Sequence, residues 1–461
     1  MSTTSKPRVL IVGGGLGGLM LGGLLERSGV PYAIFERVAK AKPVGAGMLI
    51  GPGILPTFQQ LGIYDDFLAI GKKLYCTQNY KESLEKYRPT DTKPIEAFTG
   101  YLHYVVARSA LHDLLLKLVP ADKIHFGKRV LNITEKDDIV SVQTSDNGVY
   151  EGEIVVGADG AYSAVRQRLY EKLKSEDALP SEDNEELPFS CTCLVGQTRP
   201  LDPKEFPIVD VPDSQFLTVY GHNKPFTWSV LSTSDKRLCW FVTNQLSKQA
   251  SKEAAQQRFR NNENSCWGDI PALSMRDETR DFVLELNDGK KRTMGDLYDL
   301  TPKENTSKVM FEEKVFKTWY HRRFVLIGDG AIAAMHDAMA LANLIYAMPT
   351  KTSQDITRIF EEYKSERYPA AIDCYKSSKM LGKIIESGFA GAFSLFLMTK
   401  MPQWMWRLVL ASTVKFRPQI GFLERVAIKG TVKPVPSPSE KKARAVFEKQ
   451  QQRAQNITVA V

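Results

Sequence analysis

The glycine-rich segment near the start of the chain constrains the fold more than any other stretch. Residues 9–12, Val-Leu-Ile-Val, form an apolar and largely β-branched run that predicts a buried parallel strand. Gly13, Gly15 and Gly18 follow at once in G-x-G-x-x-G spacing, and residues 19–28 predict a helix behind them. In such a turn the backbone and the helix N-terminus can approach a diphosphate. The segment therefore predicts a dinucleotide-binding loop, although a tight glycine turn without a ligand would show part of the same pattern.

An acidic residue at the end of the next strand strengthens this prediction. The apolar run Tyr32 to Phe35 predicts a second strand, and Glu36 follows it. At this spacing a carboxylate can accept hydrogen bonds from both hydroxyls of an adenosine ribose. Because Glu36 stands there and no cradle for a 2′-phosphate is evident, we expect the loop to bind FAD or NAD rather than NADP.

Composition narrows the class of protein. The chain has 461 residues, 43% hydrophobic and 25% charged, which is enough for two or three globular domains. Much of the net charge of +8 lies after residue 428, so the remainder is too weakly basic to indicate nucleic-acid binding. Six scattered cysteines favour thiols in a reducing compartment and give no metal site. Since no signal-peptide pattern opens the sequence, we expect a cytoplasmic protein.

Three further segments carry residues suited to a ligand. Gly45 and Gly47 lie in a short predicted loop that follows the nucleotide strand, where a simple turn is the alternative. Arg108 stands at a predicted strand-to-helix corner, from which a guanidinium can reach a diphosphate. Asp159, before Gly160 at the end of an apolar strand, indicates another ligand edge or an ordinary Asp-Gly turn.

The second half of the chain divides into a β-rich part and a helical part. Short predicted strands between residues 190 and 242 carry many aromatic side chains, most of which we expect in a core. A buried strand then returns at 324–327, and helices are predicted over 331–346 and 356–381. Residues 381–426 predict short apolar-faced helices that either pack on the body or lie in a membrane interface.

Five separated signals, taken in order, resemble the flavoprotein monooxygenases of the p-hydroxybenzoate hydroxylase type. Within that family the chain is most similar to the fungal branch that includes meroterpenoid and indole-diterpene epoxidases. The resemblance runs from about residue 9 to residue 378. The signals are Gly13-x-Gly15-x-x-Gly18 with Glu36, Gly45-Ala46-Gly47, Arg108 followed by Leu111, Gly157-Ala158-Asp159-Gly160-x-x-Ser163-x-x-Arg166, and Trp319 through Gly328-Asp329.

The resemblance implies an α/β fold. It consists of a discontinuous Rossmann-like FAD-binding domain of the glutathione reductase type (GR2), an inserted β-rich substrate domain and a C-terminal helical extension. The expected boundaries are 1–75, 101–170 and 307–380 for the FAD-binding parts, 76–100 for a substrate-side insertion, 171–306 for the substrate domain, 381–431 for the helical extension and 432–461 for a disordered basic tail.

The resemblance also implies roles for single residues. Gly13, Gly15, Gly18 and Glu36 would hold the AMP half of FAD, and Arg108 its diphosphate. Gly45 and Gly47 would lie near the ribityl chain and the flavin, and Asp329 would bind the ribityl hydroxyls, with Gly330 and Ala331 on the far side of the same turn. Asp159 would lie between the FAD site and the route of the nicotinamide cofactor. Arg199 and Tyr220 are candidate polar groups at the substrate pocket, where ordinary sheet residues are an equal alternative.

The activity implied is that of an FAD-dependent monooxygenase of fungal secondary metabolism. Such an enzyme uses NADH or NADPH and O₂ to hydroxylate or epoxidise an apolar aromatic or terpenoid small molecule through a flavin hydroperoxide. Peripheral membrane contact through residues 381–426 is an open alternative to a purely cytoplasmic location.

One departure from the family pattern lies at the flavin end. In the family, the strand ending in Gly-Asp continues into a loop of the type Ala-x-His-x-x-x-Pro-x-x-Gly-Gln that passes along the flavin. Here Asp329 runs directly into Gly330, so the connection is about eleven residues shorter, although short strand-to-helix turns are common in α/β folds. Two alternatives therefore stand beside the monooxygenase. They are a flavin oxidase or reductase without oxygen insertion, and a catalytically impaired flavoprotein.

Overall fold

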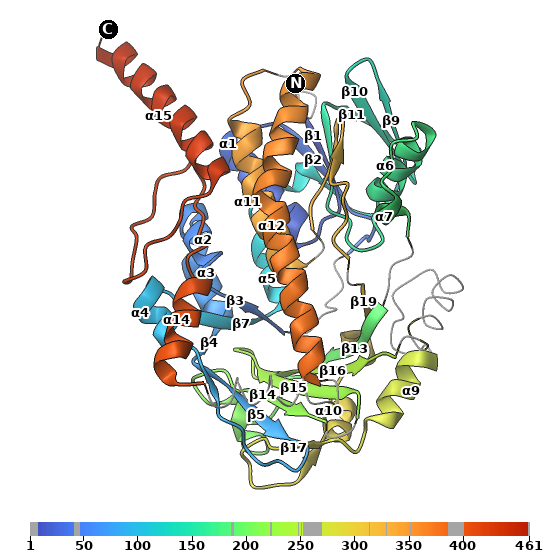
Figure 1. The fold of residues 1–461 in the computed structure, drawn as a ribbon, viewed down its shortest axis with the longest axis vertical. Coiled ribbons are helices and arrows are strands. Elements are labelled where there is room, and N and C mark those ends of the chain that lie inside the picture. The colour runs from blue at the N-terminus through green and yellow to red at the C-terminus, as the bar shows by residue number, and fades with distance from the viewer. Residues whose placement is uncertain are drawn as a thin grey trace.

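The structure is a computed structural model that describes residues 8–40, 47–185, 189–221, 224–247, 249, 251, 270–312, 314–328, 330–350, 352–385 and 401–459. Figure 1 shows two bodies, one built on a mainly parallel sheet and one on a larger, mainly antiparallel sheet, with a long helix running beside both.

The first body is built on a six-stranded sheet in the order β20-β21-β12-β1-β2-β8. β1 pairs in parallel with β12 on one side and with β2 on the other. Every residue of these three strands is buried, as expected for a parallel sheet covered on both faces. The strands are β1 (Val9–Val12), β2 (Tyr32–Phe35), β8 (Ile124–His125), β12 (Ile154–Gly157), β20 (Tyr320–His321) and β21 (Phe324–Leu326).

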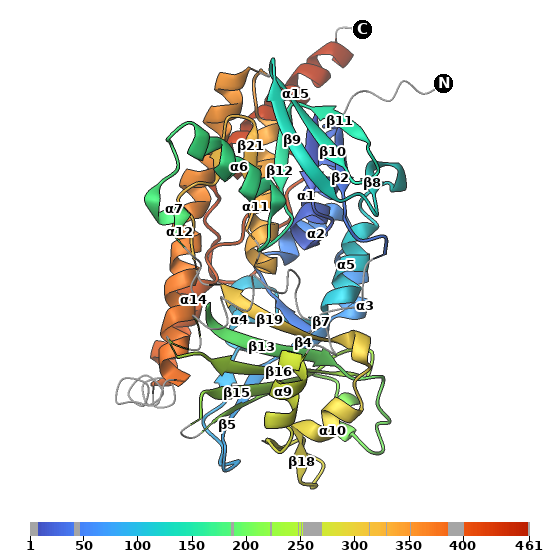
Figure 2. The ribbon, with the colours of Figure 1, turned by 90° about the vertical axis from the view of Figure 1, so that its right-hand side faces the viewer.

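Helices cover one face of this sheet, and a small antiparallel sheet covers the other (Figure 2). Val9 and Ile11 point into a core shared with the helices, whereas Leu10 and Val12 point into a core shared with the small sheet. Alternate side chains of β1 therefore pack into two different cores, one on each face of the sheet. The helical side consists of α1 (Leu16–Ser28), α5 (Arg108–Leu116) and α11 (Ala331–Tyr346), and the opposite side of α6 (Ala164–Ser175), β9 (Val130–Lys136), β10 (Ile139–Thr144) and β11 (Val149–Gly152).

The second body is a seven-stranded sheet in the order β19-β13-β16-β15-β14-β5-β6. Its outer face, which includes Trp228 and Trp240, packs with α9 and α10 in a separate core. Its inner face, which includes Leu231 and Cys239, meets the first body. The elements are β5 (Cys76–Lys81), β6 (Thr90–Asp91), β13 (Phe189–Gln197), β14 (Phe216–Tyr220), β15 (Phe226–Ser232), β16 (Leu238–Gln245), β19 (Thr306–Glu312), α9 (Ile270–Glu278) and α10 (Met294–Asp299).

Smaller elements connect the two bodies and close the surface. A three-stranded sheet in the order β3-β7-β4 follows the nucleotide-binding part of the chain. These elements are β3 (Gly47–Ile50), β4 (Lys72–Leu74), β7 (His103–Ala107), α2 (Leu55–Leu61), α3 (Tyr64–Ile70), α4 (Pro94–Thr99), α7 (Ser181–Asn184), β17 (Val283–Leu284) and β18 (Arg292–Thr293), with short 3₁₀ turns at Ala121–Lys123, Pro207–Val209 and Lys303–Asn305.

Three helices complete the C-terminal part of the described chain. α12 (Ser353–Ile385) is the long helix beside both bodies in Figure 1, and α14 (Gln403–Thr413) lies near α4. The prediction of a disordered tail over 432–461 is wrong for most of its length, because α15 (Pro438–Val459) is a helix that packs on α11 and α12. The reason is an apolar stripe, Ala443, Val446 and Phe447, which joins the main core at helical spacing despite the basic composition.

The secondary structure otherwise follows the sequence closely where the chain is described. α11 has the bounds predicted for it, and α12 extends the predicted 356–381 helix at both ends. The expected boundary between residues 306 and 307 is wrong, because β19 begins at Thr306 and pairs with β13 in the second sheet. No helix among the described residues is long and apolar enough to cross a membrane.

Candidate functional site

The glycine loop between β1 and α1 is shaped by contacts that only glycine allows. Gly13 has φ of +112°, and a Cβ there would lie 2.3 Å from the carbonyl oxygen of Ala158. A Cβ at Gly18 would lie 2.0 Å from the carbonyl oxygen of Gly13, so α1 packs directly against the turn. At Gly15 no atom lies within 4 Å of the Cβ position. The open side of the loop is therefore at the middle glycine, beside the start of α1, where a diphosphate would need room.

The Glu36 carboxylate is fixed against this loop by two backbone hydrogen bonds. The N–H of Gly14 donates to Oε2 at 2.7 Å, and the N–H of Val38 donates to Oε1 at 3.0 Å. Each carboxylate oxygen can accept a further hydrogen bond, because a carboxylate offers about four acceptor positions. Glu36 is thus oriented before any ligand arrives, and its free lone pairs suit the two hydroxyls of a ribose.

Arg108 is the first residue of α5, at the strand-to-helix corner that the sequence predicts. Its side chain is exposed, and it forms no hydrogen bond or ion pair within the described part of the chain. Surrounding protein nevertheless lowers its pKa through desolvation. One turn later, His112 places Nε2 2.9 Å from the carbonyl oxygen of Gly14, so α5 borders the glycine loop. In the sequence, the only signal for His112 is its position one turn after Arg108, and it is not among the predicted site residues.

Asp159 is held by the start of the helix that follows it. The N–H groups of Ala164 and Val165 donate to its Oδ2 at 2.6 and 3.3 Å. Its Oδ1 is buried and has no hydrogen-bond partner among the described residues. Burial raises the pKa of this carboxyl group, and an unsatisfied buried oxygen is costly. An added hydroxyl or N–H donor would satisfy it, which fits a ligand better than a simple turn.

The residues expected near the flavin are only partly described. Gly45 and Asp329 lie outside the described residues. Gly47 begins β3, and a Cβ there would lie 2.4 Å from Leu231 Cδ1, so its closest contact is with the second sheet. Gly330 precedes α11 and Ala331 is its first residue.

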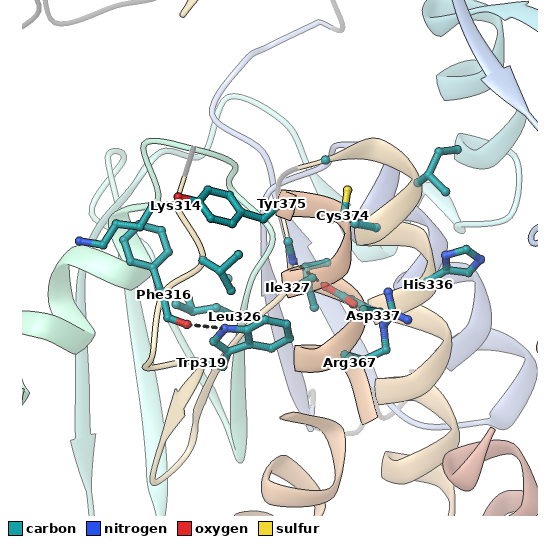
Figure 3. Close-up of a pocket in the computed structure, with 18 of the residues that line it drawn as sticks. Lys314, Phe316, Trp319, Leu326, Ile327, His336, Asp337, Arg367, Cys374 and Tyr375 are labelled. Carbon is teal, nitrogen blue, oxygen red and sulfur yellow. Dashed lines mark hydrogen bonds and ion pairs between the residues drawn. The ribbon is translucent and has the colours of Figure 1, made fainter. Parts of the chain in front are cut away.

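The turn between β21 and α11 is anchored by a buried ion pair. Asp337 of α11 accepts the N–H of Gly328 at 2.9 Å through Oδ2 and Arg367 Nε at 2.7 Å through Oδ1. Both side chains are buried, at 3% and 5% exposure. Tyr363 donates to the carbonyl oxygen of Leu326 at 3.1 Å. α11 and α12 together therefore fix the end of β21 (Figure 3). The sequence signal for this pair was an acid inside the apolar helix and an arginine on the helix that follows.

A cavity of about 470 Å³ opens beside this turn. Its walls are the end of β21, the first turns of α11, the middle of α12, the segment 314–319, and Gly157 and Gly160 beside the start of α6, with Phe416 also lining it. Figure 3 shows Phe316, Trp319, Tyr375 and Arg367 around it. Gly328 at the end of the strand and Gly330 before the helix both line it.

The two candidate substrate residues do not lie together. Arg199 is exposed just after the end of β13, and its backbone N–H donates to Leu300. Tyr220 ends β14, with its ring edge-on to Tyr87 at 6.3 Å, and burial raises its pKa. Since β13 and β14 run in opposite directions in the sheet, their C-terminal ends lie at opposite edges. Neither residue lines the cavity, and both stay predictions.

The arrangement around the glycine loop fits the adenosine diphosphate half of FAD. A pre-oriented carboxylate, an open glycine and an aspartate oxygen without a hydrogen-bond partner in the described part of the chain follow the carboxyl ends of β2, β1 and β12. That is the edge at which α/β sheets bind dinucleotides. The exposed Arg108 lies one helical turn before His112, which contacts the glycine loop.

Comparison with known proteins agrees with this geometry. Residues 6–189 match the family model described as an FAD binding domain. The chain is 28% identical over 431 residues to the FAD-dependent monooxygenase verC1 of Penicillium polonicum, covering 86% of this chain and 49% of that protein. It is also 28% identical over 405 residues to the FAD-dependent monooxygenase paxM of Penicillium paxilli, covering 81% of this chain and 78% of that protein. The chain thus spans about half the length of the first relative and most of the second.

A solved structure has the same fold. Klebsiella pneumoniae HpxO, complexed with FAD and uric acid, superposes with a TM-score of 0.66 at 19% identity, covering 88% of this chain and 96% of that one. The α/β architecture and its inserted second sheet are therefore those of that protein.

Proposed function

Because residues 6–189 match an FAD binding domain and the relatives are FAD-dependent monooxygenases, we propose that this chain is a monooxygenase of the p-hydroxybenzoate hydroxylase type that hydroxylates or epoxidises an apolar aromatic or terpenoid molecule. The co-substrates are O₂ and NADH or NADPH. The observation that carries the proposal is the Glu36 carboxylate, fixed against an open glycine loop by the N–H groups of Gly14 and Val38.

When bound, FAD supplies the redox chemistry, and the protein supplies binding, orientation and exclusion of water. In this proposal, Glu36 accepts the ribose hydroxyls and Arg108 neutralises the diphosphate. Asp159 accepts a hydrogen bond through Oδ1, which has no partner among the described residues. Asp329, with Gly330 and Ala331, would border the ribityl chain and the flavin.

The inner face of the second sheet is the surface on which we place the substrate. Phe216, Leu231 and Phe241 belong to this face, and Leu231 and Cys239 lie next to Gly47 of the first body. Tyr220 shares the face with Phe216 by strand alternation. An apolar surface opposite the flavin end would bind an apolar molecule and keep water away from it. The outer-face residues Trp228 and Trp240 are fully buried in another core and would not contact a ligand.

The test is made on the purified full-length protein. A yellow protein that consumes O₂ and NAD(P)H, and whose product carries isotope-labelled oxygen from O₂, would support the proposal. Labelled oxygen absent from the product, with flavin turnover intact, would identify an oxidase or reductase instead. Colourless protein that added FAD does not stabilise against heating would contradict the monooxygenase and the oxidase or reductase, and also an impaired flavoprotein that retains its cofactor.

We also propose peripheral membrane contact through α14. Trp404 and Leu408 on this helix are 65% and 62% exposed, and Arg407 is exposed between them. Exposed aromatic and aliphatic side chains beside a cation suit the interface of an anionic bilayer. Sedimentation with vesicles containing phosphatidylserine should recover the protein, and the Trp404→Ser, Leu408→Ser variant should stay in the supernatant. Equal recovery of both proteins would refute the contact.

A further inference from the structure

The imidazole of His112 connects α5 to the glycine loop. Its Nε2 lies 2.9 Å from the carbonyl oxygen of Gly14. A carbonyl oxygen can only accept a hydrogen bond, so Nε2 carries the hydrogen and donates it. The other ring nitrogen, Nδ1, is buried without a hydrogen-bond partner among the described residues, and the carboxylate of Asp113 lies 3.8 Å from it. The hydrogen bond of this side chain therefore goes to the loop.

The helix α5 holds this imidazole in place. Leu111, Leu114 and Leu115 of the same helix are buried in the main core. Residues four apart lie on the same side of a helix, so Arg108 and His112 share one side of α5. The contact with Gly14 shows that this side borders the glycine loop. A well-packed helix thus presents a donor to the loop, beside the arginine that we assign to the diphosphate.

This hydrogen bond fixes the direction of one peptide group. The carbonyl of Gly14 and the N–H of Gly15 belong to the same planar trans unit, in which C=O and N–H point in opposite directions. Because the carbonyl is turned towards His112, the N–H of Gly15 points away from it. This N–H donates to no group in the described part of the chain. Gly15 is also the glycine at which no atom lies within 4 Å of the Cβ position.

A second side chain holds the other backbone group of Gly14. The N–H of Gly14 donates to Oε2 of Glu36 at 2.7 Å. Gly14 is therefore restrained on both sides, by an acceptor after β2 and by a donor on α5. An unrestrained glycine has more conformational freedom than any other residue, and that freedom would be lost when a ligand binds. The two contacts reduce this cost because they order the loop beforehand.

From these contacts we propose that His112 is a positioning residue for the diphosphate of FAD. It acts through the backbone: by holding the carbonyl of Gly14, it keeps the N–H of Gly15 directed to the open side of the loop. Backbone N–H groups at the start of a helix are donors to phosphate oxygens. The inference rests on the proposed binding of FAD at this loop and is independent of the reaction with O₂.

The test compares three substitutions of His112 in the full-length protein freed of flavin. His112→Gln keeps an N–H donor at the same number of bonds from Cβ, His112→Asn carries the same amide one bond closer, and His112→Phe keeps a ring without a donor. FAD affinity is measured from the quenching of flavin fluorescence on binding. The glutamine variant should bind FAD within roughly twofold of wild type, and the other two roughly three- to tenfold more weakly, as loss of one hydrogen bond does.

The matched control is Asp113→Asn on the same helix. Asp113 is exposed, and its carboxylate forms no hydrogen bond within the described residues. This variant should bind FAD as wild type does. Urea unfolding of each flavin-free protein is measured in parallel, because a contact that serves stability alone would lower the free energy of unfolding and leave FAD affinity unchanged. Glutamine against asparagine decides the question even if His112→Phe fails to fold, because these two side chains differ mainly in reach.

Three results would overturn the inference. They are wild-type FAD affinity in His112→Asn and His112→Phe, equal weakening in His112→Gln, and equal weakening in Asp113→Asn. A wild-type protein that binds no FAD would contradict the proposed function and this inference together, whereas any of the three results with FAD-binding wild type contradicts the inference alone. Since the readout is the affinity for FAD, it is unaffected if the protein lacks monooxygenase activity.

Discussion

Asp337 shows how one buried carboxylate can organise a whole turn. It holds the backbone of Gly328 and the guanidinium of Arg367, and both side chains are nearly inaccessible to solvent. Removing one partner of such a pair leaves the other charge buried without compensation.

We expect Arg367→Met to lower the free energy of unfolding by about 3–5 kcal/mol. The matched control is Arg358→Met, because Arg358 pairs with Asp355 on the same helix but is half exposed. That exposed pair should contribute less than about 1 kcal/mol. Urea unfolding followed by circular dichroism measures both values. Equal losses in the two variants would show that the buried pair has no special role.

His336 gives the protein a sensitivity to acid. Burial, with the nearby Arg367, lowers its pKa to about 4, while an unfolded histidine titrates near 6.5. The unfolded state therefore binds the proton more readily. Stability is complete above about pH 6.5 and falls as the pH drops towards 4.

Between pH 7 and pH 5 this one group should cost on the order of 2 kcal/mol of unfolding free energy. Unfolding of wild type and His336→Gln at both pH values checks this. The variant keeps an amide donor for the carbonyl oxygen of Gly53, which His336 contacts at 3.1 Å. Wild type should lose more stability than the variant, and identical losses would refute the assignment.

Among single residues, the sequence predicts those whose role depends on neighbours that are close along the chain. Gly13 and Glu36 could be placed because strand, turn and acid follow one another within one βαβ unit. Asp337 and Arg367 could not be paired, because their contact depends on how α11 crosses α12. The sequence predicts Arg199 and Tyr220 at one substrate pocket, yet the antiparallel order β13-β16-β15-β14 places them at opposite edges of the sheet.

Among the helices and strands, α11 is one that the hydrophobic pattern of the sequence predicts correctly, whereas α15 is a helix that the sequence does not predict. The buried helix α11 is apolar on nearly every side, so its extent could be predicted to the residue. α15 is strongly basic, and its narrow apolar stripe is outweighed in any average over its length. Composition favoured disorder, but packing against α11 supplies the stability that composition could not indicate.

The stripe of α15 can be tested with two aspartates on one helix. Ala443 is fully buried and Ala445 is exposed. Ala443→Asp should lower the free energy of unfolding by about 3 kcal/mol, because it buries a charge in the main core. Ala445→Asp should change it by less than about 0.5 kcal/mol. Similar values for both would mean that α15 does not pack on α11 in solution.

At the scale of the whole molecule, Gly47 lies where the two bodies meet. A Cβ at this position would come within 2.4 Å of Leu231 Cδ1 and 3.3 Å of the Cys239 side chain. The sequence indicated a glycine that approaches a ligand, and it could not show that a strand from another domain lies against the same residue.

The two roles of Gly47 predict different results. Gly47→Ala should destabilise the protein by about 1–3 kcal/mol through overpacking, and adding Leu231→Ala should restore part of this by making room. Thermal unfolding with and without FAD measures stability and FAD affinity together. If the glycine also gives FAD its access, the double variant will regain stability but not affinity. Full recovery of both would assign Gly47 to the domain contact alone.

The cavity borders the connection from β21 to α11, because Gly328 and Gly330 both line it. Lengthening a surface connection costs little entropy, roughly 1 kcal/mol for a turn extended severalfold. The Asp337–Arg367 pair holds strand and helix in place from behind, so extra residues between 329 and 330 could fold into the cavity without displacing either element. A change in the length of this connection would then alter the cavity while the strand and the helix stay where they are.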